Sequence, residues 1–337
     1  MSKSGFARGL ASALALTLVR GLAFAQQPAG ADEKLVAAAK AEGEVVVYST
    51  APPEDNKALA SAFEARYGVP VKIWRASSED ILQRAMAEAN AGRPQADAFI
   101  NTGLGLEPMS REKLLRAIDS PLTARLIPEA SPAHREWTGF YLAIMVQLYN
   151  TNLVKKADLP KSWDDLLDSR WAGKLAIEAA DSDWFQAVVE NIGKDKGLAL
   201  FRDIAAKNRV SVRKGHSLLA NLVVAGEIPL ALTTYDFTAA QLRRSGAPVD
   251  FFAIAPAMAV QVASAVAREP KHPAAAMLFH DFLLGEAQDI LARREFITTR
   301  RDVVAKAPFP IQIQDAPRVL DGMREWEELY RKTFVAR

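Results

Sequence analysis

The chain has 337 residues, of which 50% are hydrophobic and 24% charged, and its formal net charge is +2. A chain of this length and composition can bury a large core as one large or two medium domains, which excludes an intrinsically disordered segment. Residues 1–25 carry three of the positive charges and no acid, so the remainder has a net charge of −1. This near-neutral balance provides no basic stripe, and we expect no nucleic-acid partner.

The first twenty-five residues have the layout of a secretory signal peptide. Lys3 and Arg8 precede an apolar run from Leu10 to Val19, and the segment ends with small residues at Ala23 and Ala25. This run is too short to span a bilayer as a helix, which takes roughly 20 residues. We therefore expect cleavage before Gln26 and a freely diffusing periplasmic protein. The chain contains no cysteine, so its fold must rely on packing rather than on disulfides.

Strands and helices are expected to alternate along the first third of the chain. The apolar run at 45–48 is typical of a strand buried on both faces, and further short strands are expected at 71–74 and 96–100. Helices are expected at 32–42, 56–67 and 79–91. Strands alternating with helices of this length indicate βαβ units and a mostly parallel sheet with helices on both faces.

The same alternation continues through the rest of the chain, with a long apolar strand at 140–149. Shorter strands are expected at 173–177, 210–212 and 229–233, with helices beginning near Trp184 and after Gly215. A long helical stretch follows at 273–294, broken at Gly285, and a last helix covers about 316–334.

Polar residues follow several of these strands. In open parallel sheets ligands bind beyond the carboxyl ends of the strands, and helix N-termini there favour anions. Ser, Thr and Asn at such positions often only cap helices. Several such turns together nevertheless predict one binding site, formed by the residues Ser49, Thr50, Arg75, Asn101, Thr102, Ser182, Asp183, Thr233 and Tyr235.

Two segments carry a specific resemblance to a known family. Residues 271–291 (KHPAAAMLFHDFLLGEAQDIL) resemble a late helix pair of periplasmic solute-binding proteins of ABC transporters. Residues 222–237 (LVVAGEIPLALTTYDF) are similar to the segment of the ferric-ion-binding members that ends in two adjacent tyrosines. The strand at 45–48 and the segment 148–151 fit the same family, so that the resemblance covers nearly the whole chain after residue 25.

This resemblance implies a type II periplasmic binding protein, with two α/β lobes, a hinge and a solute held between them. We expect lobe one at 31–142 plus 257–310, lobe two at 143–256, and a C-terminal helix at 311–337 packing across both. Such proteins deliver their solute to an ABC permease in the inner membrane. We expect a monomer that needs no cofactor.

The nature of the solute is less directly indicated. Ferric-binding members typically use two adjacent tyrosines, a histidine near the first strand and a glutamate near the third. Here the pair reads Tyr235-Asp236, the first turn reads Ser49-Thr50, and the third reads Asn101-Thr102. A small organic or phosphorus-containing anion, held by hydroxyls, amides, helix N-termini and Arg75, fits these residues better. Ferric iron with a synergistic anion is the alternative.

Other residues leave two interpretations open. Trp184 and Phe185 could stack on a ligand or pack in the core, and His216 could face the binding site or only begin a helix. His272 and His280 are expected to pack or cap, and the four histidines show no metal-ligand spacing. We identify no catalytic residues and no metal site. A secreted hydrolase on the same fold is a second alternative, but none of the common catalytic or nucleotide-binding motifs occurs.

Overall fold

The computed structural model describes residues 32–335, so the expected signal peptide lies outside the described part of the chain. These described residues belong to one compact unit. None of the helices in the described residues is long and apolar enough to cross a membrane.

The first third of the chain alternates strands and helices, as expected. Its boundaries follow from local signals: the Asp32 side chain accepts a hydrogen bond from the Lys34 N–H at the start of the first helix, and Gly43 ends that helix with a φ of +89°. The elements are α1 (Glu33–Glu42), β1 (Val45–Ser49), α2 (Pro53–Tyr67), β2 (Val71–Arg75), α3 (Ser78–Asn90), β3 (Ala98–Thr102) and α4 (Gly103–Arg111).

The middle of the chain begins with a long strand, β4 (Thr138–Asn150), in which every residue is buried. Five short 3₁₀ helices flank it, at Pro121–Arg125, Pro128–Ala130, Lys156–Asp158, Asp164–Leu167 and Ser169–Trp171. The following elements are β5 (Leu175–Glu178), α5 (Ser182–Ile192), α6 (Lys194–Asn208), β6 (Ser211–Arg213), α7 (His216–Val224), β7 (Leu230–Tyr235), α8 (Asp236–Arg244) and β8 (Val249–Phe252).

The last third returns to the first sheet before ending in helices. Its elements are β9 (Ala257–Val266), α9 (Pro273–Leu284), α10 (Ala287–Arg293), α11 (Arg301–Val304), β10 (Ile311–Ile313), α12 (Ala316–Tyr330) and a π-helical turn at Arg331–Val335.

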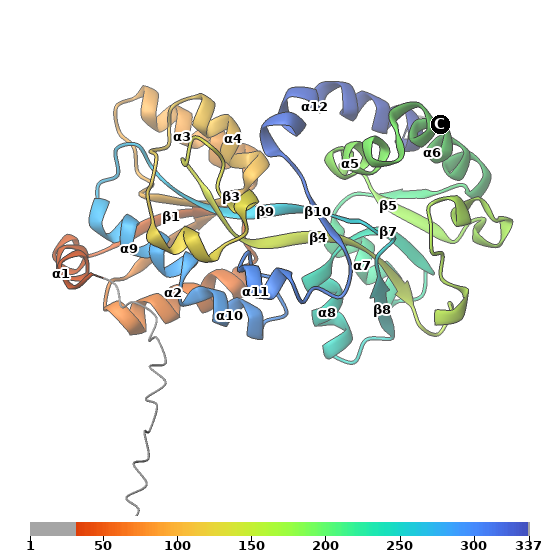
Figure 1. Ribbon diagram of the computed structural model, residues 1–337, viewed down its shortest axis with the longest axis horizontal. Helices are drawn as coiled ribbons and strands as arrows, with labels where there is room; N and C mark the ends of the chain where they lie inside the picture. Colours follow the sequence, from red (N-terminus) through yellow and green to blue (C-terminus); the bar gives the residue numbers. More distant parts are fainter. Residues whose placement is uncertain (1–31, 336–337) are drawn as a thin grey trace, which may run out of the picture. The chain divides into compact units, whose positions relative to one another are not determined.

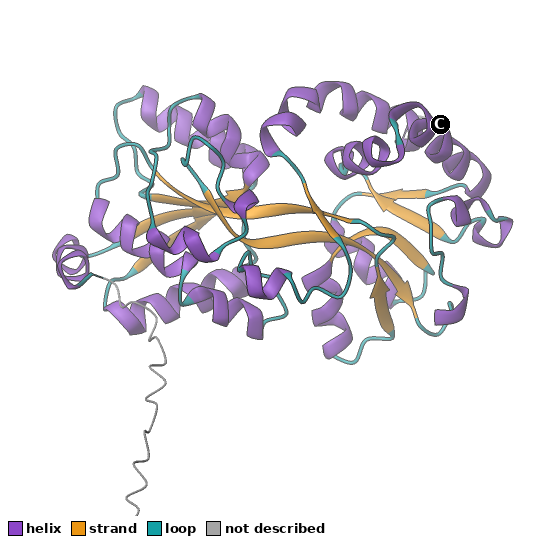
Figure 2. Ribbon diagram, in the orientation of Figure 1, coloured by secondary structure: helices purple, strands orange, loops and turns teal. Residues whose placement is uncertain are grey.

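These strands form one mixed sheet in the order β2-β1-β3-β9-β4-β7-β5-β6, with β10 beside β9 and β8 beside β4. We call β2, β1 and β3 the first half-sheet, and β7, β5 and β6 the second half-sheet. Pairing is parallel between β1 and β2, and between β5 and β7, whereas β9 and β4 run antiparallel to their neighbours on the path. Figure 1 shows β4 and β9 running from one group of helices to the other, and Figure 2 shows helices on both sides of the strands.

The structure differs from the expected elements in several places, and α8, β8 and β10 are among the elements that were not expected. Strand β3 lies two residues later than the expected 96–100, so that Asn101 and Thr102 belong to the strand itself. Helix α4 begins directly after it, although Pro108 lies inside the helix. Strand β9, for which the sequence analysis expects no element, is ten residues long and entirely buried.

The C-terminal helix α12 packs against helices from both halves of the chain. Near its start, Asp321 accepts a hydrogen bond from Arg111 of α4 at 2.8 Å. At its other end, the Tyr330 hydroxyl donates to the backbone carbonyl of Glu178, which ends β5. The helix therefore links α4 to the strand end that carries Glu178.

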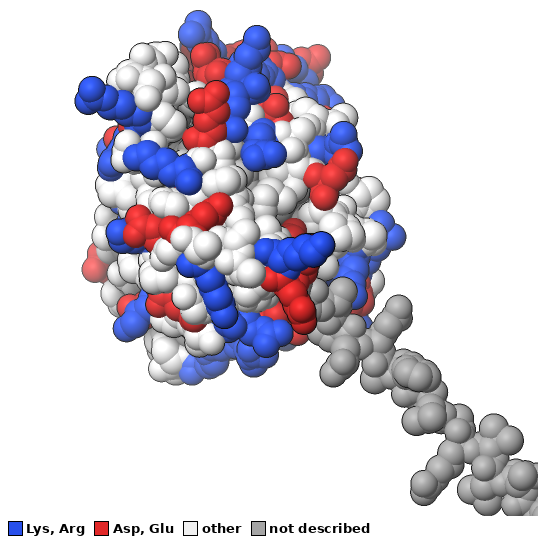
Figure 3. Space-filling model, turned by 90° about the vertical axis from the view of Figure 1, so that its left-hand side faces the viewer, with Lys and Arg blue, Asp and Glu red and all other residues white. Residues whose placement is uncertain are grey.

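Charged residues of both signs are interspersed on the face shown in Figure 3. Lysine and arginine side chains alternate there with acids rather than gathering in one area. This mixed distribution agrees with the near-neutral net charge of the chain after residue 25.

Candidate functional site

The end of the first half-sheet brings four of the expected site residues together. In the parallel register Ser49 lies opposite Ile100, so that the turns after β1 and β3 are neighbours. The Ser49 hydroxyl is buried and donates to Asn56 Oδ1 at 2.8 Å, and the Thr50 N–H donates to the Ile100 carbonyl at 2.9 Å. Thr102 caps α4, accepting from the Gly105 N–H at 3.1 Å. Much of the polar chemistry of Ser49 and Thr102 thus serves local structure.

Asn101 is the exception in this group. Its Oδ1 accepts from the Ser78 hydroxyl at 2.6 Å and from the Thr102 N–H at 2.8 Å. Its Nδ2 is buried and has no hydrogen-bond partner. The amide lies so close to Gly105 that no side chain fits there: a Cβ added at Gly105 would lie only 2.5 Å from Nδ2. A buried amide donor without an acceptor carries a free-energy cost that a ligand oxygen would remove.

Arg75 lies beside this group, at the end of β2 and opposite Ser49 in the register. Its side chain is exposed, and its Nε donates to the Ala51 carbonyl at 3.0 Å. This hydrogen bond holds the guanidinium against the turn between β1 and α2. The arginine therefore contributes a positive charge to the same edge of the sheet.

The end of the second half-sheet holds the remaining expected residues. The Thr233 hydroxyl accepts from the Glu178 N–H at 3.3 Å, and Ser182 is the first residue of α5. Burial, together with the charge of Asp181, raises the pKa of Asp183 to about 6. Tyr235 ends β7, with its ring 4.5 Å from the His216 ring and stacked on Phe237 at 5.4 Å.

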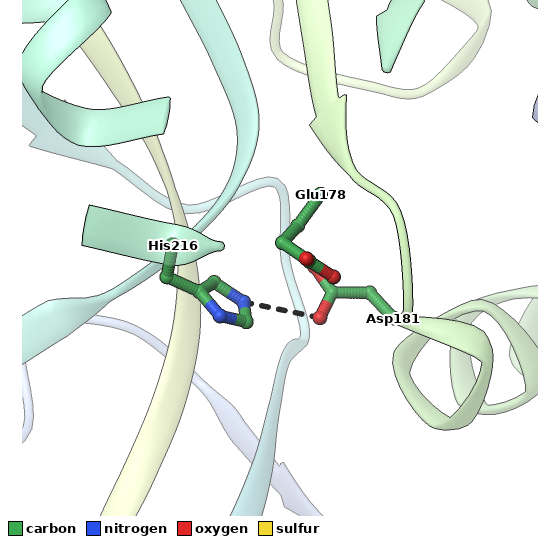
Figure 4. A group of neighbouring side chains, drawn as sticks. All are labelled: Glu178, Asp181 and His216. Atoms are coloured by element: carbon green, nitrogen blue, oxygen red, sulfur yellow. Dashed lines mark ion pairs between the residues drawn. The ribbon is translucent and has the colours of Figure 1, made fainter. Parts of the chain in front are cut away.

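Three further ionisable residues lie at this edge. Glu178 ends β5, Asp181 precedes α5 and His216 begins α7, and their ligand atoms all lie within 4.8 Å of one another. We call Glu178, Asp181, Asp183 and His216 the acidic cluster. Figure 4 shows the side chains of Glu178, Asp181 and His216 pointing toward one another from separate elements. Glu178 is not among the residues predicted from the sequence, although an acid directly after a short apolar strand is itself a strand-end signal.

Both carboxylate oxygens of Glu178 have hydrogen-bond donors, whereas one oxygen of Asp181 has none. Glu178 accepts from the Gly215 N–H at 2.7 Å through Oε1 and from the Ala180 N–H through Oε2, which ties both neighbouring turns to β5. Asp181 Oδ1 forms an ion pair with His216 Nε2 at 3.0 Å, without the alignment of a hydrogen bond, and Asp181 Oδ2 is buried without a partner. Burial by itself would lower the pKa of His216, but Asp181 and the nearby acids outweigh it and raise that pKa.

Tyr141 connects the two edges. It is buried in β4, and its ring packs edge-on against Phe237 and Phe296. Burial raises the pKa of Tyr141, and the charges of Asp55 at the start of α2 and Asp236 at the start of α8 raise it further. Tyr141 in turn contributes electrostatically to the raised pKa of Tyr235. The two edges therefore approach each other around Tyr141 and Tyr235.

Asp236, the residue after Tyr235, is turned into the protein. Its Oδ1 accepts from the Ile144 N–H of β4 at 3.1 Å, and only 4% of the residue is exposed. Burial raises the pKa of this carboxyl to about 7. Because both Ile144 and the start of α8 depend on it, Asp236 has a structural role rather than that of a second ligand beside Tyr235.

The raised pKa of Asp236 predicts a pH-dependent stability. Below about pH 4 the carboxyl is protonated in the folded and the unfolded chain, whereas in the folded chain it ionises only near pH 7. The wild type should therefore lose stability between these pH values. Asp236→Asn keeps an acceptor for Ile144 and should remove this loss, gaining about 2–4 kcal/mol over the wild type from pH 4 to pH 8.

Urea unfolding at several pH values measures this difference. Asp203→Asn, at an exposed position on α6, is the matched control and should show no such trend. A constant difference between Asp236→Asn and the wild type over the whole pH range would contradict the prediction.

The remaining histidines have structural partners. His272 Nδ1 lies 2.7 Å from Asp97 Oδ2, His134 Nε2 lies 3.2 Å from Glu107 Oε2, and the buried His280 Nδ1 lies 3.0 Å from the Ser264 hydroxyl. Trp184 and Phe185 are 1% and 0% exposed, so they pack in the core. Of the two interpretations open for these aromatic residues, the structure supports packing.

Comparison with known proteins identifies the family. The profile of the family described as "Bacterial extracellular solute-binding protein" matches residues 80–321. An "Fe(3+)-binding periplasmic protein" of Serratia marcescens is 27% identical over 212 residues, 61% of this chain and 58% of that protein. A "Putative 2-aminoethylphosphonate-binding periplasmic protein" of Salmonella typhimurium is 30% identical over 216 residues, 61% of each chain. The chain thus spans less than two thirds of the length of these relatives.

Solved structures agree on the fold. Iron-bound HitA from Pseudomonas aeruginosa superimposes with a TM-score of 0.72 at 23% identity, over 86% of this chain and 99% of that one. The periplasmic binding protein AfuA from Actinobacillus pleuropneumoniae, with fructose-6-phosphate bound, gives 0.69 at 20% identity, over 87% and 98%. The fold is therefore that of the type II periplasmic binding proteins. The chain belongs to the family of bacterial extracellular solute-binding proteins that includes the periplasmic ferric-binding proteins.

Proposed function

We propose that this protein is the periplasmic solute-binding component of an ABC importer, and that its solute carries a compact anionic group. This anionic group is a phosphonate, a phosphate ester or a carboxylate. The family membership supports a binding role, and the relatives are named as binding proteins rather than as enzymes. One relative is named for 2-aminoethylphosphonate, and one solved neighbour holds fructose-6-phosphate.

The observation that carries the anionic group is the unpartnered Asn101 amide. Its Nδ2 is a buried donor at the carboxyl end of β3, directly before the N-terminus of α4. The residues that end β1 and β3 here are uncharged, and Arg75 supplies the nearby positive charge. Neutral donors, a helix N-terminus and an arginine together favour an anion at the end of the first half-sheet.

Delivery to a permease would follow the mode expected for the family. The proposed lobes, 31–142 plus 257–310 and 143–256, would close around the solute, with β4 and β9 crossing between them. Contacts from both half-sheets would then favour the closed state through their differential affinity. We propose that the protein acts as a monomer and that its partner is an inner-membrane permease.

Ferric iron is the second candidate, favoured by Tyr235 and the neighbouring acidic cluster and by the names of several relatives. Three features weigh against it. Asp236 stands where a second tyrosine would be needed and points inward. The strand ends Ser49-Thr50 and Asn101-Thr102 carry no histidine or acid. Burial strongly raises the pKa of Tyr235, which opposes formation of a tyrosinate.

Calorimetry on protein stripped of co-purified solute by unfolding and refolding tests the proposal. We expect one-to-one binding of at least one compound among small phosphonates, phosphate esters and carboxylates, without turnover. Mass spectrometry of the solute released on unfolding would identify the natural ligand. Tight ferric binding with a tyrosinate-to-iron absorption band, and no binding of these anions, would favour the second candidate. Product formation would favour a hydrolase.

A further inference from the structure

The acidic cluster at the end of the second half-sheet has an unmet need for positive charge. It contains the carboxyl groups of Glu178, Asp181 and Asp183, with His216 as its basic member. Both oxygens of Glu178 already accept backbone N–H groups. Asp181 Oδ2 has no partner, although the Asp181 side chain is only 5% exposed. A buried carboxylate oxygen without a donor is costly, and a cationic donor is the partner that removes most of this cost.

The position of Asp181 makes this feature more than a solvated acidic patch. Figure 4 shows its carboxylate facing the His216 ring, with the ion pair marked, and the ligand atoms of Glu178, Asp181 and His216 all lie within 4.8 Å of one another. The Tyr235 ring lies 4.5 Å from the His216 ring, and the charges of Asp181 and Asp183 contribute to the raised pKa of Tyr235. Acids and an aromatic ring around one point are the groups that recognise an ammonium ion.

We propose that the acidic cluster binds a positively charged amine of the solute through Asp181, so that the solute is a small zwitterion. This inference rests on the proposed function, which assigns the anionic group to Asn101, Arg75 and the N-terminus of α4. The first half-sheet would then bind the anionic end of the solute, and the second half-sheet would bind its cationic end. A solute that contacts both half-sheets is what would hold the two lobes closed.

A divalent metal is the other occupant that these side chains could accept. The ligand atoms of Glu178, Asp181 and His216 are close enough together to share an ion. Metal binding, however, requires a neutral imidazole, and the neighbouring acids favour the protonated form of His216. The backbone hydrogen bonds to both oxygens of Glu178 also compete with a metal. The arrangement therefore favours an ammonium group.

Two pairs of compounds that differ only in the amine test the inference. They are 2-aminoethylphosphonate with ethylphosphonate, and 3-aminopropionate with propionate. Calorimetry is performed on the stripped, EDTA-dialysed protein. We expect the amine-bearing member of at least one pair to bind about 10- to 100-fold more tightly, because a hydrogen bond between charged groups is gained. Asp181→Asn should abolish this preference, because the carboxylate that would pair with the amine is lost.

Two further variants serve as controls. Asp203→Asn removes an exposed acid on α6 and should keep the full preference. Thermal unfolding checks that Asp181→Asn is folded. If it is not folded, Asp183→Asn replaces it in the comparison. This variant removes one acid of the cluster but keeps Asp181 and its ion pair with His216, so we expect a smaller loss of the preference for the amine.

The outcomes separate the two proposals. Equal affinity for both members of each pair, unchanged by Asp181→Asn, would overturn the amine assignment and leave the anion-binding function standing. Failure to bind any member of either pair would overturn the inference. It would overturn the proposed function as well only if no phosphate ester or other small anion binds in calorimetry. Binding of the amine compounds that appears only after zinc or manganese is added would overturn the ammonium assignment in favour of a metal.

Discussion

Asn101→Asp should lower the affinity for the anionic solute by at least about 100-fold. The change replaces the unpartnered Nδ2 donor by an oxygen and adds a negative charge where we place the anion. Losing a hydrogen bond to a charged group costs about 1.5–3 kcal/mol. Two like charges 4 Å apart add about 4 kcal/mol at an effective dielectric constant of 20. Since about 1.4 kcal/mol corresponds to a tenfold change in affinity, the expected loss is large.

The variant should nevertheless fold. An aspartate keeps an oxygen that can accept from the Ser78 hydroxyl and the Thr102 N–H, and the N-terminus of α4 favours a negative charge. Calorimetry with the solute measures the affinity, and urea unfolding measures the stability. Asn90→Asp, at an exposed position at the end of α3, makes the same charge change elsewhere and should bind normally. Undiminished affinity in Asn101→Asp would remove Asn101 from the site.

The sequence predicted the elements whose signals are local. Strand β1 is a continuous apolar run closed by a turn, and α1 has an N-capping Asp32 and a C-terminal Gly43. These signals depend only on residues within a few positions of one another. For the same reason the strand ends at Ser49 and Tyr235 could be located from the sequence.

Features that depend on distant segments could not be read in this way. Strand β9 is rich in alanine and small residues, and its strand conformation depends on pairing with β3 and β4, which lie far away in the sequence. Asp236 occupies the place of the second tyrosine of the ferric-binding members, but the Ile144 N–H, 92 residues away, turns its carboxyl inward. The sequence around Asp236 gives no information about its hydrogen bond with the distant Ile144.

The sequence predicted most of the residues of the site, but not its distribution of charge. The expected residues of the first half-sheet do lie together around the ends of β1 and β3. At the second half-sheet the sequence predicted Ser182, Asp183, Thr233 and Tyr235 as site residues, but not Glu178 or Asp181. Two turns, the one between β5 and α5 and the one before α7, must meet before these acids face His216. The charge of the site therefore emerges only from the tertiary structure.

Trp184→Ala should destabilise the protein by about 3–5 kcal/mol while leaving the site intact in the folded fraction. Trp184 is 1% exposed, and its ring lies 5.4 Å from the Trp163 ring and 5.8 Å from the Phe201 ring, both edge-on. Truncation would leave a large cavity beside these rings and remove two aromatic contacts. Such a loss is a large fraction of the 5–15 kcal/mol typical of folded domains.

Trp184 also lies two residues after Ser182 in α5, which explains why the sequence alone left a ligand-stacking role open. Its burial within the aromatic core separates the two roles experimentally. Urea unfolding should show the loss of stability, and calorimetry at low temperature, where the variant remains folded, should show an affinity within about threefold of the wild type. Trp184→Phe keeps an aromatic ring in the same space and should recover most of the stability, because less volume is lost. An affinity loss of tenfold or more in Trp184→Ala, with the free energy of unfolding preserved, would instead place the indole ring on the solute.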